Sequence, residues 1–253
     1  MTKILQKIKD NQQSGRKSLA LLIDPDKSTD LSKLIHTINI AQENCIDMFF
    51  VGGSLITTNN LSDIITTIKN HSNLPVIIFP GSTMHIDMNA DGILFLSLLS
   101  GRNPDLLIGQ HVIAAPILKN SSLEVISTGY LLINSDRTTS VAYMSNTTPI
   151  PGDKYSIAAS TAIAGEMLGS QLIYLDAGSG GTPISKTMIA KVKKAINIPL
   201  IIGGGINSAA KAEDALKAGA DIIVIGNAAE KNPNLLIEVS DKIYELNKSL
   251  DIH

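Results

Sequence analysis

Short, uninterrupted apolar runs recur along the chain, and each ends in Gly, Asp, Pro or Ser. Such runs are typical of strands that are buried on both faces, as in a parallel sheet. Segments with helical patterns separate most of them, which favours a closed barrel over an open doubly wound sheet. The predicted strands are SLALLID (18–24), DMFFVGG (47–53), PVIIFPG (75–81), GILFLS (92–97), EVISTGYLLI (124–133), QLIYLDAG (171–178), PLIIGGG (199–205) and DIIVIGN (221–227).

The segments between the strands carry signals for where helices begin and end. A polar residue that accepts hydrogen bonds at the first turn favours a start, and a glycine just past the last turn favours a stop. The clearest cases are residues 153–168, from Asp153 to the stop at Gly169, and residues 208–218, from Ser208 to the stop at Gly219.

One connection is too short for the regular pattern. Only about ten residues, STMHIDMNAD (82–91), separate the third and fourth predicted strands, whereas a crossover between parallel strands takes a dozen or more. We therefore expect the third helix of the barrel to be shortened or missing. No linker, repeat or low-complexity segment divides the chain, so residues 1–253 are expected to form a single (β/α)₈ barrel of the α/β class.

The composition agrees with one large barrel and argues against nucleic acid or a membrane as a partner. The chain has 253 residues, of which 44% are hydrophobic, and a net charge of −2 without a long basic run. Nucleic acid is therefore not expected as a partner, and an anionic substrate must be bound by local features. No uncharged apolar run approaches the roughly 18 residues of a membrane-spanning helix. Residues 1–17 predict a short amphipathic helix and not a signal peptide, which favours a cytoplasmic protein.

Cysteine and histidine give no sign of a metal cluster. The single Cys45 excludes an internal disulfide, and its apolar neighbours Ile46, Met48 and Phe49 predict a buried thiol. No two histidines have the helical spacing of a metal-binding pair. We expect all five to lie at the surface or to have no role, namely His36, His71, His85, His111 and His253.

Three glycine-rich loops follow predicted strands in the C-terminal part of the chain. In barrels of this type a phosphate often sits on the loops after the seventh and eighth strands. Those loops are GGGINS (203–208) and GNAA (226–229), and DAGSGG (176–181) follows the sixth strand. Glycines let backbone N–H groups approach phosphate oxygens closely. The three loops predict a phosphate cradle to which Ser179 adds a hydroxyl, although a glycine turn alone is an ordinary feature of a loop.

A candidate metal site lies at the ends of the first two predicted strands. Asp24 ends the strand in LLIDPDK and faces the barrel mouth, and VGGS places Ser54 at the same height. One carboxylate, one hydroxyl and waters suit Mg²⁺, which shares the phosphate oxygens of its substrate. The alternative is a structural role for Asp24 as the cap of the next loop, a role that Asp26 or Asp30 could take instead.

Taken together, eight short motifs resemble those of the geranylgeranylglyceryl phosphate synthase family, which are prenyltransferases on a modified barrel. The motifs occur in the family's order and cover almost the whole chain, so the set is far more specific than any one of them. They are LLIDPDK (21–27), VGGS (51–54), FPGS (79–82), GYLLI (129–133), SNTTPIP (145–151), YLDAGSG (174–180), GGGI (203–206) and GN (226–227).

The resemblance implies transfer of a geranylgeranyl group from geranylgeranyl diphosphate to the 3-hydroxyl of sn-glycerol 1-phosphate, which yields an ether lipid precursor. It places Mg²⁺ on Asp24 and Ser54, where the ion stabilises the leaving diphosphate, and it implies a homo-oligomer. A carboxylate takes the proton of the acceptor hydroxyl as general base, and the matching residue is Asp176. The implied glycerol phosphate contacts are Tyr174, Leu175, Asp176, Ala177, Gly178, Ser179, Gly180, Gly204, Gly205, Gly226 and Asn227.

Asp176 departs from the family, in which this position is commonly Glu. Aspartate keeps the chemistry but shortens the reach by one methylene, so the backbone or a water must compensate. The prenyl tail needs an apolar groove, and residues near the short third connection could line it, although each is equally well explained as barrel core. The candidates are Met84, Ile86, Met88, Leu96, Leu98 and Leu99.

Three other functions remain open at this point. A heptaprenylglyceryl phosphate synthase typically carries Lys two residues before the metal-binding Asp, whereas this chain has Leu22. A barrel isomerase or aldolase acting on a sugar phosphate would need a Schiff-base lysine or a second acid–base residue at a strand end, and Lys27 and Lys154 lie beyond strands or on helices. The last alternative is a phosphate-binding barrel that has lost its chemistry through Asp176.

Overall fold

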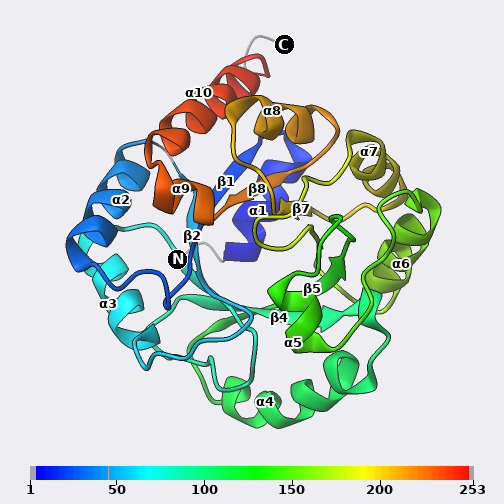
Figure 1. Ribbon diagram of the computed structural model, residues 1–253, viewed down its shortest axis with the longest axis horizontal. Helices are drawn as coiled ribbons and strands as arrows, with labels where there is room; N and C mark the ends of the chain where they lie inside the picture. The colour runs from blue at the N-terminus through cyan, green and yellow to red at the C-terminus, as the bar shows by residue number, and fades with distance from the viewer. Residues whose placement is uncertain (1–3, 45, 251–253) are drawn as a thin grey trace.

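The computed structural model describes residues 4–44 and 46–250, which form a closed barrel of parallel strands β1 to β8 in chain order (Figure 1). The last strand pairs with the first, and Ser18 to Leu21 lie beside Ile222 to Ile225. The (β/α)₈ fold predicted from the apolar runs is therefore confirmed. The strands are β1 Ser18–Ile23, β2 Met48–Gly52, β3 Val76–Phe79, β4 Gly92–Leu98, β5 Glu124–Leu132, β6 Leu172–Asp176, β7 Leu200–Gly203 and β8 Ile222–Ile225.

Helices form a ring around the barrel (Figure 1). None of those in the described part of the chain is long and apolar enough to cross a membrane. Cys45 and His253, for which predictions were made above, lie outside the described residues. The helices are α1 Ile4–Gln13, α2 Leu31–Glu43, α3 Leu61–His71, α4 Gln110–Lys119, α5 Ser140–Ser145, α6 Tyr155–Met167, α7 Lys186–Ala195, α8 Ala209–Lys217, α9 Asn227–Lys231 and α10 Asn234–Lys248, with a 3₁₀ turn at Leu99–Gly101 and a π-helical turn at Asp105–Gly109.

Two helices were predicted with a start and a stop, and three of these four ends are correct, including the stop of α6 at Gly169, which has φ +97°. Helix α8 begins after Ser208, whose side chain accepts a hydrogen bond from the backbone N–H of Lys211, and it is followed by Gly219 at φ +120°. Helix α6 begins at Tyr155 and not at Asp153, whose carboxylate instead pairs with the neighbouring Lys154. An exposed carboxylate next to a lysine has an alternative to capping, and the motif alone did not reveal it.

The connection between β3 and β4 contains no helix, as its length predicted. His85 organises the loop that takes the place of the helix. It is 8% exposed, and its Nδ1 accepts a hydrogen bond from the backbone N–H of Gly81 at 3.1 Å. The expectation that no histidine has a role is therefore wrong for His85, because a buried imidazole replaces a hydrogen-bond partner that a helix would have supplied.

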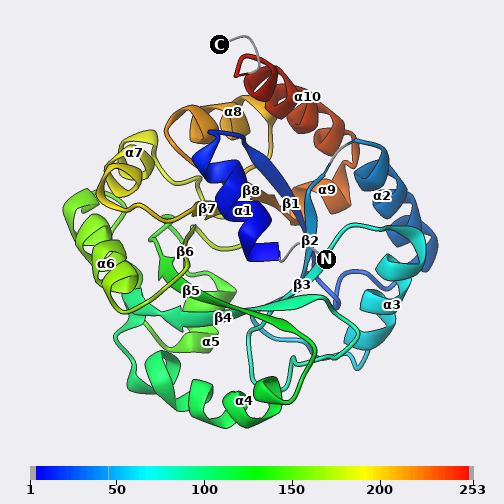
Figure 2. The ribbon, with the colours of Figure 1, turned by 180° about the vertical axis from the view of Figure 1, so that it is seen from behind.

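Alternate residues of each strand face two separate apolar layers, as the period of a strand requires. One set packs between the sheet and the helices, and the other fills the barrel interior. Helix α1 closes the N-terminal end of the barrel (Figure 2). The Glu124 carboxylate accepts hydrogen bonds from the backbone N–H groups of Ile4 and Leu5 at 2.7 and 2.9 Å, and Ile8 joins the interior layer. The opposite end, where the strands finish, remains open for a site.

Candidate active site

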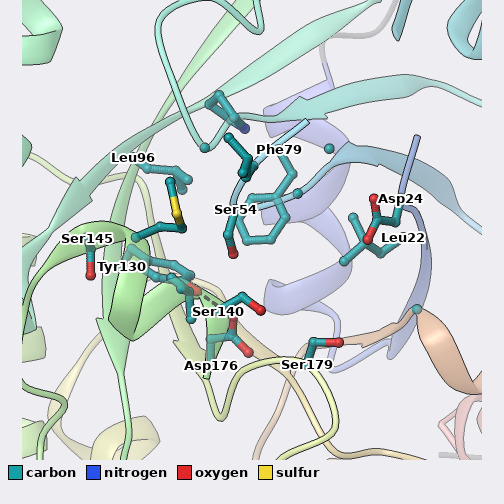
Figure 3. Close-up of a pocket in the computed structure, with 18 of the residues that line it drawn as sticks. Leu22, Asp24, Ser54, Phe79, Leu96, Tyr130, Ser140, Ser145, Asp176 and Ser179 are labelled. Carbon is teal, nitrogen blue, oxygen red and sulfur yellow. Dashed lines mark hydrogen bonds between the residues drawn. The ribbon is translucent and has the colours of Figure 1, made fainter. Parts of the chain in front are cut away.

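A cavity of about 1190 Å³ opens at the C-terminal ends of the strands. Figure 3 shows Asp24, Ser54, Asp176 and Ser179 pointing into the same space, although they lie at the ends of three different strands, β1, β2 and β6. The barrel brings together segments that are about 150 residues apart in sequence. They meet at the C-terminal ends of the strands, where active sites of this fold lie. The predicted metal residues and the predicted cradle therefore belong to one site.

Asp176, the predicted general base, is the last residue of β6 and is 8% exposed. Its Oδ1 accepts a hydrogen bond from the backbone N–H of Gly178 at 2.8 Å. Its Oδ2 accepts a hydrogen bond from the phenol of Tyr130 on β5 (Figure 3). Because both oxygens are held, the carboxylate has a fixed orientation at the wall of the cavity.

The surroundings of Asp176 give it the character of a base. Burial raises the pKa of Asp176, while the hydrogen bonds from Tyr130 and Gly178 act in the opposite direction. Burial and the neighbouring charge of Asp176 raise the pKa of Tyr130 well above its ordinary value, so the phenol keeps its proton and donates it to the hydrogen bond. A carboxylate of raised pKa accepts a proton more readily than an ordinary aspartate.

The glycine loops after β6, β7 and β8 meet on one side of the cavity. Gly180, Gly204 and Gly205 have positive φ angles of +69°, +82° and +73°. A methyl group on Gly204 would lie 2.7 Å from Asp176 Oδ1 and 2.8 Å from the backbone nitrogen of Ala177, so only glycine lets the two loops approach this closely. Backbone in this conformation presents successive N–H groups to an anion. The geometry suits a phosphate.

A chain of polar contacts crosses the mouth of the cavity. Lys27, in the loop after β1, pairs with Asp24 and also donates a hydrogen bond to Asn227 Oδ1 at 2.9 Å. The side-chain amide of Asn227 donates in turn to the hydroxyl of Ser179. These four side chains follow β1, β8 and β6, so they couple the metal side of the cavity to the phosphate side.

The Asp24 side of the cavity offers oxygen ligands. A methyl group on Gly53 would lie 3.4 Å from Asp24 Oδ1, which places this carboxylate against the chain just before Ser54. Among the described residues, no group of three or more His, Cys, Asp or Glu side chains could hold a metal. One carboxylate and one hydroxyl thus fit an ion that takes its other ligands from water and from a substrate, as Mg²⁺ does.

The two other aspartates of this loop have structural roles. Asp30 accepts a hydrogen bond from the backbone N–H of Lys33 and caps α2. Asp26 accepts hydrogen bonds from the backbone N–H and hydroxyl groups of both Thr57 and Thr58. The bonds from Thr58 and Thr57 hold the pKa of Asp26 well below its ordinary value. Asp24 also takes part in the loop, because its Oδ1 accepts a hydrogen bond from the backbone N–H of Asp26 at 3.2 Å.

Beside the cradle the cavity continues into an apolar groove. Of the predicted tail residues, Ile86, Leu96 and Leu98 line it. The prediction is wrong for the other three: Met84 and Met88 are 87% and 48% exposed, and Leu99 packs towards Gly129 and Gly165. Further apolar lining comes from β4, the π-helical turn, α4 and α5, through Ile93, Leu94, Phe95, Leu106, Ala114, Leu118, Val141 and Met144.

His111, on α4, is part of the groove wall and not a surface residue. It is 9% exposed, and its Nε2 lies 3.1 Å from the hydroxyl of Ser97. Its ring meets Phe95 edge to face, with ring centroids 4.5 Å apart. The expectation that every histidine is incidental is wrong here as well, because the His111 ring packs on Phe95 and its Nε2 meets Ser97, while its buried Nδ1 has no hydrogen-bond partner among the described residues.

Not every predicted substrate contact reaches the cavity with its side chain. Leu175 and Ala177 are buried in the layer between the sheet and the helices, so only their main chain could meet a substrate. The N–H of Gly178 is already bonded to Asp176. Tyr174 lines the cavity from below and stacks on Phe79 with ring centroids 5.2 Å apart. The side chains of Asp176, Ser179 and Asn227 and the glycines at positions 180, 204, 205 and 226 all line it.

Sequence reasoning missed the roles of Tyr130 and Lys27. Tyr130 lies in the GYLLI motif, and a hydroxyl within a buried strand was the signal that it needs a polar partner. Lys27 follows Asp24 in LLIDPDK, and a lysine three residues after a carboxylate could have been recognised as its ion-pair partner. Neither contact to a distant strand, Tyr130 with Asp176 or Lys27 with Asn227, can be read from local sequence.

A (β/α)₈ barrel with glycine-rich loops after its last three strands has the arrangement that is typical of phosphate-binding barrels. Within that class, the sequence pattern of the PcrB family matches residues 12–246, and this chain belongs to that family. The geranylgeranylglyceryl phosphate synthase of Spirosoma linguale is 52% identical, with 96% of this chain and 98% of its own length covered. The synthase of the same name from Thermococcus kodakarensis is 41% identical, with coverages of 91% and 90%.

Solved structures agree with this assignment. The crystal structure of (S)-3-O-geranylgeranylglyceryl phosphate synthase from Thermoplasma acidophilum, in complex with its substrate sn-glycerol-1-phosphate, superposes with a TM-score of 0.90. Its sequence is 32% identical, and the superposition covers 97% of this chain and all of the other. The resemblance inferred from the eight motifs is therefore confirmed over nearly the whole chain.

Proposed function

We propose that this chain transfers a geranylgeranyl group from geranylgeranyl diphosphate to the 3-hydroxyl of sn-glycerol 1-phosphate and so forms an ether bond. The observation that carries the proposal is one cavity that joins a phosphate cradle, a buried carboxylate and an apolar groove. A small phosphorylated acceptor and a long apolar donor require these three parts side by side. The synthases named above support the same reaction.

The acceptor binds with its phosphate on the glycine loops and its far hydroxyl towards Asp176. The loop after β6 carries both the carboxylate and the phosphate-binding backbone, so a single small molecule spans the two. Asp176 Oδ1 or Oδ2 takes the proton as the hydroxyl oxygen attacks the allylic carbon of the donor. Tyr130 and Gly178 keep the carboxylate aimed at the cavity, which compensates for the shorter reach of aspartate.

Asp24 and Ser54 would hold Mg²⁺ together with the donor diphosphate. The ion, when bound, supplies positive charge to the leaving diphosphate. Lys27 pairs with Asp24 and reaches Asn227, so its ammonium lies between the two anionic groups of the substrates. Asp24 thereby links the position of the leaving group to that of the acceptor.

The apolar groove takes the prenyl tail. Its lining from β4 and α4 is apolar apart from Gln110 and His111. Leu22, which stands where the heptaprenyl-specific group typically has Lys, lies beside Gly226, since a methyl group there would be 3.4 Å from its Cβ. This apolar residue next to the cradle favours geranylgeranyl diphosphate as the donor.

We also propose that the chain forms a homo-oligomer. The exposed apolar side chains of Val112, Ile113 and Ile117 on α4 support this proposal.

The test is turnover with radiolabelled sn-glycerol 1-phosphate and a panel of prenyl diphosphates from geranyl to heptaprenyl. We expect a lipid-soluble labelled product, formed fastest with geranylgeranyl diphosphate and not with sn-glycerol 3-phosphate at a comparable rate. Fastest turnover with heptaprenyl diphosphate would assign the longer-chain activity. Binding of glycerol phosphate without product from any donor would indicate a barrel that has lost its chemistry.

A further inference from the structure

The loop between β5 and α5, residues 133–139, lies along the glycine loop at 177–181. The two loops touch at paired positions. A methyl group on Gly178 would lie 2.5 Å from Thr139 Cγ2, and one on Gly181 would lie 2.5 Å from Ser135 Oγ. Ser135 is 4% exposed, and its hydroxyl has no hydrogen-bond partner among the described residues. The β5–α5 loop is therefore a wall of the phosphate cradle and not a separate surface feature.

Arg137 is the cationic residue of this loop, and it reaches the cradle. A methyl group on Gly180 would lie 3.5 Å from its guanidinium nitrogen Nη1. Gly180 itself lines the cavity between Ser179 and Gly181. Within the described part of the chain, Arg137 forms no ion pair, and its side chain is exposed. The guanidinium is thus beside the cradle and free to engage an anion.

Among the described residues, two lysines line the cavity, against four aspartates. Lys27 is paired with Asp24, and Lys231 is an exposed residue of α9. Backbone N–H groups alone hold a phosphate dianion less firmly than they do with a charged partner, because charge-assisted hydrogen bonds are roughly twice as strong as neutral ones. The charged side chains that line the cavity are Asp24, Asp26, Asp105, Asp176, Lys27 and Lys231.

We infer that Arg137 is a substrate-binding residue, whose guanidinium folds over the glycine loop and pairs with the phosphate of the acceptor. The planar fork of arginine matches two phosphate oxygens at once. The backbone cradle holds the phosphate from the barrel side, and Arg137 holds it from the solvent side. This role rests on the proposed function, in which the glycine loops bind the acceptor and not the donor.

The test compares Arg137→Gln and Arg137→Lys with Lys119→Gln, which removes the same charge from an exposed position at the end of α4. Dissociation constants for sn-glycerol 1-phosphate and for inorganic phosphate are measured by calorimetry without donor. Arg137→Gln should weaken both by about 10- to 100-fold, the range for a hydrogen bond to a charged group. Arg137→Lys should recover part of the loss, and Lys119→Gln should bind as the wild type does.

Steady-state kinetics identify which anion Arg137 serves. The KM for sn-glycerol 1-phosphate should rise in Arg137→Gln, whereas the KM for geranylgeranyl diphosphate should stay within about twofold of the wild type. A rise in the donor KM with unchanged acceptor binding would overturn the inference, and so would equal binding by Arg137→Gln and Lys119→Gln. A wild type that binds inorganic phosphate but forms no product would instead contradict the proposed function, and the phosphate measurement would still decide the role of Arg137.

Discussion

Replacing Asp176 by asparagine removes one proton acceptor at nearly constant volume. Asparagine can still accept the hydrogen bond from the backbone N–H of Gly178, and its amide can donate to the oxygen of Tyr130. The backbone, the glycine loops and the apolar groove stay as they are. The change therefore isolates the proton-transfer role of the carboxylate from its structural role.

The size of the effect follows from the role of a general base. Loss of such a group typically costs a factor of about 10²–10⁴ in rate, which is about 2.7–5.4 kcal/mol in the barrier. The KM for glycerol 1-phosphate should change little, because the phosphate contacts survive. Burial raises the pKa of Asp176, so the folded state binds more protons than the unfolded state between the ordinary and the raised pKa. Its charge therefore lowers stability as pH rises through that window, and Asp176→Asn should melt no lower than the wild type at pH 7.

The assay measures kcat and KM together with the melting temperature. Asp241→Asn, an exposed change of the same kind on α10, serves as the matched control and should behave as the wild type does. Asp176→Glu should keep much of the activity, because it restores the acid that is common in the family. If Asp176→Asn loses less than several-fold in kcat, the proton goes to water or to another group, and the assignment of Asp176 is wrong.

Further predictions concern Tyr130, the glycine loops and the metal site. Tyr130→Phe removes a hydrogen bond that stabilises the charged carboxylate, so the pKa of Asp176 should rise further and the acidic limb of the kcat profile should move to higher pH; an unmoved limb would contradict this. Gly204→Ala should lower the melting temperature, because the left-handed φ of +82° costs roughly 1–2 kcal/mol and the methyl group would lie 2.7 Å from Asp176 Oδ1. Unchanged stability and acceptor KM would show that the cradle is misplaced. Chelation should abolish activity and Mg²⁺ should restore it, and Asp24→Asn should weaken binding of the donor more than binding of the acceptor; full activity in excess chelator would exclude the metal.

The barrel could be predicted from the sequence because each of its strands is buried on both faces. An apolar run such as PLIIGGG (199–205) predicts a strand without knowledge of its partners, since any parallel neighbour covers it equally well. The ends of the runs are less certain. Residues 177–178 and 204–205 extend two predicted strands in sequence, but Gly178, Gly204 and Gly205 have positive φ angles and belong to the loops that form the cradle. Glycine can adopt either a strand or a loop conformation, and tertiary contacts decide between the two.

Short helices and buried polar contacts could not be predicted in the same way. Helices α5 and α9 have six and five residues, too few for a hydrophobic period to emerge. His85 and His111 have polar partners, but each partner lies in a loop or on a strand whose position depends on the whole fold. Local sequence shows that a residue is polar, but only the fold shows which group forms a hydrogen bond with it.

The candidate site shows the same division. Asp24, Ser54 and the glycines were placed by their position at the ends of strands, and the fold brings such ends together. Tyr130, Lys27 and the neighbourhood of Arg137 depend on contacts between loops that are far apart in sequence. The positions of these residues at one cavity could thus be predicted from motifs, whereas the residues that orient them required the structure.

In the proposed reaction, the hydroxyl oxygen of the acceptor becomes the ether oxygen of the product. The most direct measurement uses sn-glycerol 1-phosphate labelled with ¹⁸O at the 3-hydroxyl, geranylgeranyl diphosphate and the purified protein, with mass spectrometry of both products. The label should be retained in the prenyl ether and should be absent from the released diphosphate. Label in the diphosphate, or cleavage of the donor with no labelled ether, would contradict the proposed reaction.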